Sequence, residues 1–390
     1  MAKGRQGNVS QLTVCKLWAK AGGRCEYEGC NKLLYKDDLT SEDINRSLVA
    51  HIVAASPNGP RGSEADSGRL VDNIDNVMLL CHEHHRLIDH EGLNDHPAER
   101  LRAMKKKHED RIRMLTEIDV EKKCLPVMYA ANIGMVTPRI TRSELSNAVV
   151  PDNYPDERTI EISYKNSSTY DNESLFWQME VKQLKDKVYQ DVLPRFKDGK
   201  YDCISLFALA PQPLLVKLGT LLNDVYKVKV YQKHREPDTW TWQVDNEQNH
   251  FCIETPTDKT KTPVLVFAIS ADAITSRVKQ KYGETASIWV ISANKVGNDM
   301  LRSKDQLAEF RTIVRKTLDE INSATAESSI KVYMAMPAAC AVELGRVWMP
   351  KADKSLVLYD KNNSFGEDDV ETITINHCCP VKVPDDYYKV

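Results

Sequence analysis

Cysteine and histidine residues in the first quarter of the chain have the types and spacing of metal ligands. Cys25 and Cys30 bracket a short turn, and Cys81 and His84 form a second pair with two residues between them. Three thiolates and one imidazole make a normal tetrahedral environment for structural zinc, and they suit zinc better than magnesium. We therefore predict a zinc site at these four residues. His82 is an alternative to His84 as the fourth ligand, although His84 fits the two-residue spacing better.

Three polar residues near these pairs suit the cleavage of a phosphodiester. His51 ends an apolar stretch, Asn76 precedes the apolar run that reaches Cys81, and His85 follows the second ligand pair. An imidazole can take a proton from water near neutral pH, which makes His51 a candidate base. A divalent cation would neutralise the scissile phosphate and the leaving oxygen. Asp89 lies four residues after His85 on the same helical face. It is a candidate ligand of that cation, together with His85.

The combination of these elements resembles the HNH nuclease family over about residues 15–115. The matching stretches are Leu48-Val-Ala-His51-Ile-Val, Asp75-Asn76-Val-Met-Leu-Leu-Cys81 and His84-His85-Arg-Leu-Ile-Asp89. The resemblance implies a ββα-metal fold in which His51 activates water, Asn76 fixes the shape of the loop, and His85 binds a catalytic magnesium or similar ion. Many family members place a metal ligand directly before the base, where this chain has Ala50. The set of catalytic metal ligands is therefore incomplete by the usual pattern.

Length and composition indicate a folded protein of two or more domains. The chain has 390 residues, of which 42% are hydrophobic and 28% charged. No apolar run approaches the roughly 18–20 residues that cross a bilayer, and the first residues lack the apolar core of a signal peptide. We therefore expect a cytoplasmic protein with no membrane partner, whose ten cysteines are thiols or metal ligands. The net charge of −3 means that DNA binding would depend on local basic patches. The most basic stretch, residues 100–107, is either such a patch or a solvated helix face.

The pattern along the chain predicts three segments. Residues 1–118 form a small polar module that needs a metal staple, and residues 119–170, with several prolines and a polar run, are expected to be a linker and lead-in. In residues 171–390, strands alternate with helices, which predicts an α/β fold with a largely parallel sheet. The expected strands cover 204–210, 228–232, 264–270, 288–293, 332–336 and 356–359. The expected helices cover 184–196, 214–225, 304–321 and 338–347.

The third segment contains the same sequence pattern twice, an apolar run followed by a helix with a Leu-Gly pair. An apolar run at 206–211 leads into a helix that carries Leu218-Gly219, and a similar run at 332–337 leads into a helix that carries Leu344-Gly345. Two duplicated α/β units would produce this echo. Chance similarity between two strand–helix units is the alternative.

Aromatic and basic residues follow the expected strands, where α/β sheets usually bind ligands. Stacked aromatic rings with Arg and Lys suit nucleobases and phosphates, although a buried Trp beside solvated charges is the alternative. The candidate ligand-binding residues are Pro211, Gln212, Lys233, His234, Arg235, Trp240, Trp242, Pro337 and Ala338. The adjacent residues His377, Cys378 and Cys379 are expected to be structural, because three neighbours in sequence do not form a tetrahedral site.

This third segment resembles the SAVED domain. The matching stretches are 206–213, Leu218-Gly219, 231–235, 240–242, 335–337 and 343–346. The resemblance implies two CARF-like (Rossmann-like) α/β units that sense a cyclic di- or trinucleotide. An HNH module fused to a SAVED domain is similar to the effector nucleases of CBASS anti-phage systems. It implies a bacterial protein that self-associates on ligand binding and degrades double-stranded DNA, so that the infected cell dies.

Two other functions fit the same sequence. One is a restriction endonuclease whose C-terminal domain reads modified DNA bases. Comparing the effect of modified DNA with that of cyclic nucleotides would distinguish it from a nuclease activated by cyclic nucleotides. The other is a nucleotide-sensing protein whose zinc module binds DNA without cleaving it. Ala50 is the feature that favours this inactive alternative.

Overall fold

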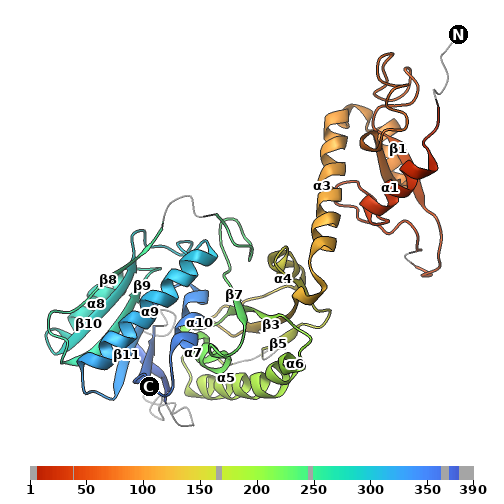
Figure 1. The fold of residues 1–390 in the computed structure, drawn as a ribbon. Helices are drawn as coiled ribbons and strands as arrows, with labels where there is room; N and C mark the ends of the chain where they lie inside the picture. Colours follow the sequence, from red (N-terminus) through yellow and green to blue (C-terminus); the bar gives the residue numbers. More distant parts are fainter. Residues whose placement is uncertain (1–6, 38, 164–168, 245–248, 362–368, 377–390) are drawn as a thin grey trace. The chain divides into compact units, whose positions relative to one another are not determined.

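The computed structural model describes residues 7–37, 39–163, 169–244, 249–361 and 369–376. The chain folds into two compact units, Met1–Asp119 and Val120–Val390 (Figure 1). The segment from His377 to Cys379 lies outside the described residues. Among the residues that are described, no helix is long and apolar enough to cross a membrane.

The first unit is built on a two-stranded antiparallel sheet followed directly by a helix. Its elements are α1 (Gln11–Ala21), β1 (Ser47–His51), β2 (Val77–Cys81), α2 (His82–Arg86) and α3 (Ala98–Glu117), with short 3-10 turns at Ile74–Asn76 and Leu93–Asp95 and a π-helical turn at Leu87–Glu91. His51 pairs with Val77 at one end of the sheet, and Ser47 pairs with Cys81 at the other. The order β1, β2, α2 therefore brings the candidate base and the candidate metal ligands onto one small framework.

Two helices cover the buried strand β2. Helix α1 begins after Ser10, whose hydroxyl accepts a hydrogen bond from the Thr13 amide, and it ends at Gly22, which has φ of 60°. Leu17 of α1 and Leu101 of α3 are fully buried in a core shared with β2. This core is small, so a metal staple would add substantially to its stability.

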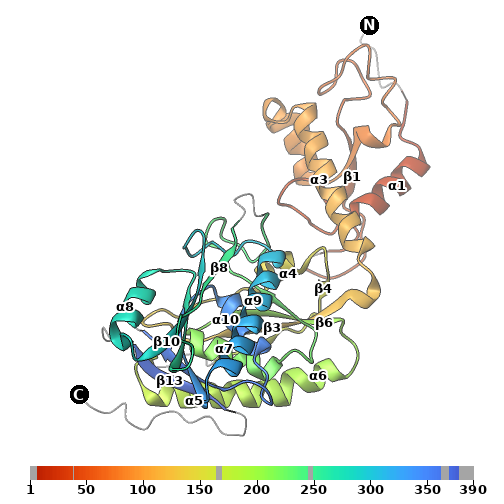
Figure 2. The same ribbon diagram turned by 60° about the vertical axis from the view of Figure 1, so that its left-hand side comes forward.

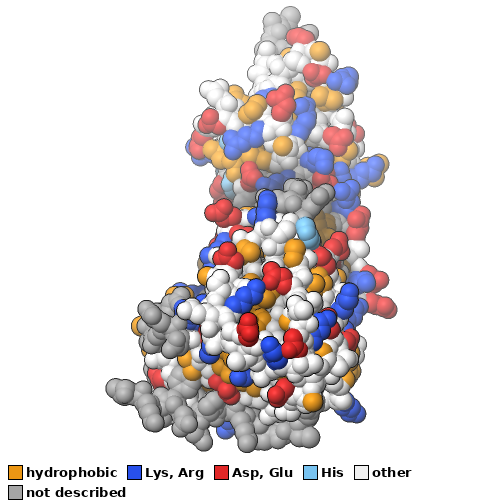
Figure 3. Space-filling model, turned by 90° about the vertical axis from the view of Figure 1, so that its left-hand side faces the viewer, with side chains coloured by type: hydrophobic (Ala, Val, Ile, Leu, Met, Phe, Trp, Pro, Cys, Tyr) orange, Lys and Arg blue, Asp and Glu red, His pale blue; other side chains and the backbone are white. Residues whose placement is uncertain are grey.

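The basic stretch 100–107 lies on α3, and its lysines are paired with acids. Lys105 is buried and contacts Glu109, while Lys106 Nζ lies 2.6 Å from Asp110 and Lys107 Nζ lies 2.7 Å from Glu28. Basic and acidic side chains are interspersed over the face drawn in Figure 3 as well. The three lysines therefore do not form an unpaired cationic patch.

The second unit contains two sheets. The five-stranded sheet has the order β4-β3-β6-β7 with β5 beside β3, and the six-stranded sheet has the order β13-β12-β11-β9-β10-β8. The strands are β3 (Lys123–Ala130), β4 (Tyr154–Pro155), β5 (Ile160–Ile162), β6 (Cys203–Leu209), β7 (Val228–Tyr231), β8 (Phe251–Glu254), β9 (Thr262–Ala268), β10 (Ala286–Ala293), β11 (Ser329–Ala335), β12 (Ser355–Asp360) and β13 (Val370–Ile375). All pairs of the first sheet are parallel, and β8 and β13 are antiparallel edges of the second. The prediction of a mixed α/β fold with parallel sheets is confirmed.

Helices fill the space between the two sheets and cover their outer faces (Figures 1 and 2). The helices are α4 (Arg142–Val149), α5 (Ser174–Lys187), α6 (Leu193–Lys197), α7 (Gln212–Leu222), α8 (Ala273–Tyr282), α9 (Lys304–Ala324) and α10 (Ala338–Val347), with a π-helical turn at Val188–Val192. Helix α10 contacts β6, β7 and α9, and α7 contacts β12, β13 and α5. Ile274 and Val278 of α8 pack on the outer face of the six-stranded sheet, and Leu145 and Val149 of α4 pack on that of the five-stranded sheet.

The two halves of this unit meet through α7 and α10. A Cβ atom at Gly219 would overlap the carbonyl oxygen of Val342, and a Cβ atom at Gly345 would overlap that of Val216. The helix backbones approach this closely only because both positions are glycine. The two Leu-Gly pairs of the sequence echo are thus equivalent positions in one helix–helix contact.

Residues 120–163 belong to the second compact unit and include strands of its sheet, whereas 119–170 was predicted to be a linker and the entry to the second domain. Strand β3 pairs with β6 from Cys124 to Ala130, and Leu125 and Val127 are fully buried. The proline of β3, Pro126, lies between the β4 pairing, which ends at Cys124, and the β5 pairing, which starts at Val127. A missing N–H is tolerated in this gap, so the proline does not exclude a central strand.

Candidate functional site

Four ligand atoms converge in the first unit. One atom each from Cys25, Cys30, Cys81 and His84 lies within 4.8 Å of the other three. The Sγ atoms of Cys25 and Cys81 are 3.8 Å apart, which is the edge of a tetrahedron with metal–sulfur bonds of about 2.3 Å. The Nδ1 atom of His84 lies 3.0 Å from Cys81 Sγ and 3.8 Å from Cys25 Sγ. The cluster can therefore hold a metal ion such as zinc.

The surroundings of the cluster also favour metal binding. Burial raises the pKa of the Cys25 thiol to about 11, so a nearby cation is needed to keep it as a thiolate. Burial lowers the pKa of His84, which favours the neutral imidazole that binds metals. The His84 ring stacks on Tyr27 at 4.1 Å, and the Tyr27 hydroxyl lies 3.0 Å from His96 Nε2. His82 is exposed and lies outside the cluster.

His51 is the last residue of β1 and is held in one tautomer. Its Nε2 atom lies 3.0 Å from the Val71 carbonyl oxygen. A carbonyl only accepts hydrogen bonds, so Nε2 carries the proton and Nδ1 is left as the basic nitrogen. Asn76 fixes the next part of the loop, because its side chain accepts from the Val53 amide at 2.9 Å and donates to the Val53 carbonyl at 2.9 Å. The same amide group also donates to the Leu70 carbonyl at 3.1 Å.

Asp89 is engaged by an arginine through one of its two carboxylate oxygens. Its Oδ1 atom accepts a hydrogen bond of 2.6 Å from the guanidinium of Arg61. Its Oδ2 atom lies 3.8 Å from Nε2 of His85, one turn earlier in the helix. Carboxylates that bind metals commonly accept such a second hydrogen bond, so Asp89 stays the candidate second ligand beside His85.

Arg61 connects the strand that carries His51 to the helical turn that follows His85. Its guanidinium also donates to the Ile52 carbonyl at 2.6 Å and to the Ile88 carbonyl at 2.7 Å. The side chain is 9% exposed, and the residue adopts a φ of 57°, which is uncommon outside glycine. Arg61 was not among the site residues predicted from the sequence. The only sequence signal was its place in the polar loop 56–62.

The second unit has a cavity of about 830 Å³ at the carboxyl ends of parallel strands from both sheets. Six of the candidate ligand-binding residues line it: Pro211, Gln212, Lys233, Arg235, Pro337 and Ala338. Further lining residues come from β11, β12, α8, the segment between β9 and α8, and the loop before α5. Segments that are far apart in the sequence therefore form one site, as expected where parallel strands end.

The cavity has features that attract anions. Helices α7 and α10 both begin at its wall, directly after Pro211 and Pro337, so the positive ends of two helix dipoles lie there. Arg235 and Lys361 add positive charge to the lining, whereas Arg277 is held by Asp369 through two contacts of 2.8 Å. A ligand with two or more phosphates would suit this arrangement.

The structure does not place His234, Trp240 and Trp242 in this cavity. Trp240 is 1% exposed and packs against Phe207 at 5.3 Å on the outer face of the five-stranded sheet. His234 is also 1% exposed, and its ring meets Trp242 edge-on at 5.9 Å. For Trp240 the structure favours the alternative of a buried tryptophan beside solvated charges. Trp240 is a core residue, because the segment after β7 folds back over the sheet.

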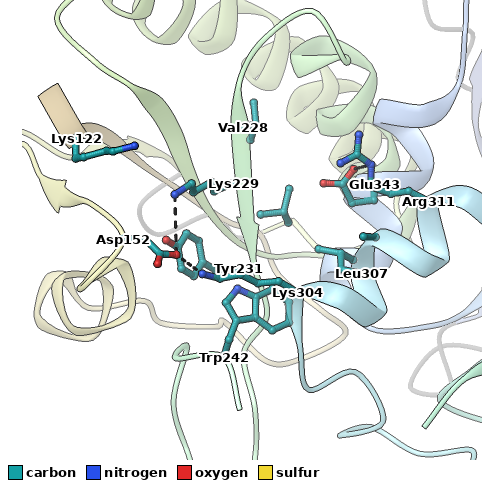
Figure 4. Close-up of a pocket in the computed structure, with 12 residues that line it drawn as sticks. Lys122, Asp152, Val228, Lys229, Tyr231, Trp242, Lys304, Leu307, Arg311 and Glu343 are labelled. Carbon is teal, nitrogen blue, oxygen red and sulfur yellow. Dashed lines mark hydrogen bonds and ion pairs between the residues drawn. The ribbon is translucent and has the colours of Figure 1, made fainter. Parts of the chain in front are cut away.

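Trp242 lines a different cavity of about 440 Å³ beside β7 (Figure 4). Lys229 and Lys304 from opposite sides of this cavity both contact Asp152, and Arg311 Nε lies 3.3 Å from Glu343. These cations are already paired with carboxylates of the same chain. The larger cavity is therefore the better candidate for an anionic ligand.

Comparison with known families finds a match for part of the unit that contains the larger cavity. Residues 184–367 match the family model of SAVED, the SMODS-associated and fused to various effectors sensor domain. The matched part of the chain is therefore similar to the SAVED domain. The match begins within α5, so β3 lies outside it although β3 belongs to the same sheet as β6. The comparison with curated proteins finds no match.

Solved structures of SAVED proteins are similar to the chain at low identity. The Acinetobacter baumannii Cap4 SAVED/CARF-domain containing receptor with the cyclic trinucleotide 2′3′3′-cAAA has a TM-score of 0.41 and 10% identity, over 72% of this chain and 60% of that one. The Moraxella osloensis Cap4 SAVED/CARF-domain containing receptor has a TM-score of 0.37 and 11% identity, over 72% and 59%. The match thus spans about three fifths of the length of these receptors.

Proposed function

We propose that this protein is a metal-dependent HNH endonuclease that cleaves double-stranded DNA when a cyclic oligonucleotide binds its SAVED domain. The observation that carries the nuclease proposal is the fixed tautomer of His51. Its Nε2 is bound to the Val71 carbonyl, and its Nδ1 is left as a base at the edge of the ββα framework. A buried structural histidine would have both nitrogens engaged, whereas His51 is half-buried with one nitrogen engaged by the hydrogen bond described.

The chain's own residues supply the proton transfer and the positioning. In the proposed step, Nδ1 of His51 takes a proton from water as the water oxygen bonds to phosphorus and the bond to the leaving oxygen breaks. A magnesium or similar ion bound at His85 would supply charge neutralisation at the phosphate and the leaving oxygen. Asn76 and Arg61 hold the loop and the helical turn on which the two histidines depend. Ala50 is fully buried in the core, so it offers no ligand to that ion.

The sensor half of the proposal rests on the SAVED match and on the cavity. Two helix N-termini and two cations at one cavity suit the phosphates of a cyclic di- or trinucleotide. Such a ligand activates the nuclease only if it binds the active state more tightly than the resting one. We propose self-association as that active state, which would bring nuclease modules together on DNA. In a bacterial cytoplasm, the outcome would be antiviral defence by abortive infection, as in CBASS.

Plasmid cleavage tests both halves of the proposal. The full chain with magnesium should leave supercoiled DNA intact and should degrade it when the correct cyclic di- or trinucleotide is added. The same ligand should raise the melting temperature, because it binds only the folded state. Cleavage that needs modified DNA and ignores every cyclic nucleotide would favour the restriction enzyme instead.

His51→Ala tests the assignment of the base. We expect the ligand-stimulated cleavage rate to fall about 100-fold or more, with ligand binding unchanged. The matched control is His90→Ala, which changes an exposed histidine of the same module and should leave the rate near that of the unmodified protein. Equal rates for His51→Ala and the unmodified chain would exclude His51 as the base.

A further inference from the structure

The large cavity of the SAVED domain contains carboxyl groups among its cations. Asp360, the last residue of β12, and Asp171, in the loop before α5, both line it. Asp171 is held in place, because its Oδ2 atom accepts a hydrogen bond of 2.9 Å from the Gly134 amide. Burial and the neighbouring charge of Asp171 raise the pKa of Asp360 to about 7. A carboxyl group in this position is costly, which calls for a role in the site.

A second acceptor in the same cavity lacks a donor. The Oε1 atom of Gln212, at the start of α7, is buried and has no hydrogen-bond partner. Gln232, by contrast, uses its Oε1 atom to accept from the Ala339 amide at 3.0 Å. The cavity therefore offers an unsatisfied acceptor at Gln212, and the Asp360 carboxyl, which the Lys361 amide already approaches, has capacity for further donors from a ligand.

Phosphates cannot be the partners of these acceptors, because phosphates donate no hydrogen bonds and repel a carboxylate. The donors must come from ribose hydroxyls or from the bases, and a ribose hydroxyl offers one donor whereas a base edge can offer two. An ionised carboxylate has two acceptor oxygens, and it matches a base edge with two adjacent N–H donors. Among the common bases, guanine alone has such an edge, at N1 and N2. Adenine and cytosine alternate a donor with an acceptor, and uracil has one donor between two acceptors.

We propose that Asp360 reads a guanine base of the cyclic oligonucleotide by accepting hydrogen bonds from its N1 and N2 positions. This inference rests on the proposed sensor function and specifies its ligand. Helix N-termini and the side chains of Arg235 and Lys361 bind the phosphates, and Gln212 accepts from a further ligand donor. Asp171 sets the position of the wall through Gly134. A site built around acceptors rejects a base that cannot donate to them.

The test compares ligands that differ only at the base. The full chain is titrated by calorimetry with a guanine-containing cyclic trinucleotide and with its all-adenine counterpart of the same linkage, and then with the matching pair of cyclic dinucleotides. In the ring size that binds, we expect the guanine-containing ligand to bind about 10-fold tighter or more. Asp360→Asn should remove this preference and strengthen adenine binding, because an amide offers one donor and one acceptor to the adenine edge.

Two further variants keep the test decisive. Asp360→Ser should lose the guanine preference without a gain for adenine, which separates base reading from a general change in the cavity. Asp305→Asn, at an exposed acid in the first turn of α9 and outside the cavity lining, is the matched control and should behave like the unmodified chain. Melting curves without ligand establish that each variant is folded.

The outcomes separate this inference from the proposed function. Equal or tighter binding of the all-adenine ligand, unchanged in Asp360→Asn, would overturn the guanine assignment and leave the sensor function standing. Failure of every cyclic nucleotide to bind the folded chain would overturn the sensor function itself.

Discussion

Arg61 illustrates how one buried side chain can hold a candidate active site together. Its guanidinium donates to the Ile52 carbonyl, next to His51, and to the Ile88 carbonyl. It also donates to the carboxylate of Asp89, which lies one helical turn after His85. The spacing of the two histidines therefore depends on a residue that touches neither substrate nor metal. Positioning errors of about 1 Å can cost about 100-fold in rate.

Replacing Arg61 should accordingly impair cleavage without abolishing DNA or ligand binding. We expect Arg61→Gln to lower the ligand-stimulated rate about 10- to 100-fold and to raise the magnesium concentration needed for half-maximal activity, because Asp89 beside His85 loses the guanidinium that fixes its position. Plasmid cleavage over a magnesium series measures both effects. Arg69→Gln, which breaks an exposed pair with Asp66, is the control. A rate change without any shift in the magnesium requirement would argue against positioning of the metal ligand.

A buried carboxyl group should make the second unit's stability depend on pH. Glu180 of α5 is 2% exposed and accepts a hydrogen bond of 3.0 Å from Tyr129. Burial raises its pKa from 4.5 to about 7, against the opposing effect of the Tyr129 bond. The folded state thus retains a proton that the unfolded state releases, so stability falls as pH rises from 4.5 to about 7. The loss is about 3 kcal/mol at most.

Urea unfolding of the full chain at about pH 5 and about pH 8 checks this expectation. Glu180→Gln should reduce the difference in unfolding free energy between the two conditions, because the amide does not titrate. Glu157→Gln changes an exposed acid and should leave the difference as it is. An unchanged pH dependence in Glu180→Gln would assign it to other groups.

At the scale of elements, the contact between α7 and α10 joins the two halves of the sensor unit. Each glycine of the contact faces a backbone carbonyl of the other helix, and a backbone has little freedom to move away. We expect Gly219→Ala and Gly345→Ala each to lower the free energy of unfolding by about 3 kcal/mol or more. Thermal and urea unfolding measure the change. Gly297→Ala, where a Cβ atom would meet nothing within 4 Å, should have a far smaller effect.

The elements also differ in how well the sequence predicts them. The apolar runs at β6, β9, β10 and β11 and the amphipathic pattern of α9 predicted those elements, because burial imposes a clear period on them. Strand β3 was missed because Pro126 normally indicates a loop, and the gap between β4 and β5 that accommodates it is a tertiary feature. Short edge strands such as β5 and β8 gave no periodic signal.

At the scale of the whole molecule, the division into two compact units leads us to expect that the structural metal stabilises the first unit and the cyclic nucleotide binds the second independently. Removing the ion from the Cys25, Cys30, Cys81 and His84 cluster should unfold the first unit, because a bound structural metal supplies much of the stability of such a module. Cys81→Ser should do the same. We expect cleavage to be lost while cyclic nucleotide still binds the second unit. Zinc analysis, plasmid cleavage and calorimetry on the same sample measure the three quantities.

Loss of nucleotide binding on removal of the metal would contradict this expectation. If chelation abolished nucleotide binding as well as cleavage, the two units could not be acting independently. The control is the unmodified chain to which zinc is returned after chelation, which should recover both the metal and the cleavage activity.

The sequence alone determined the metal quartet, the histidine and asparagine positions and the α/β character of the sensor unit. Short-range spacing and local periodicity carry that information, because ligand pairs and buried strands constrain residues close together in the chain. Only the tertiary structure decided that Asp89 is bound by Arg61, that Trp240 is a core residue, and that Asp360 shares a cavity with Gln212. Each of these depends on contacts between residues that are far apart in the sequence, and the physical cause is packing.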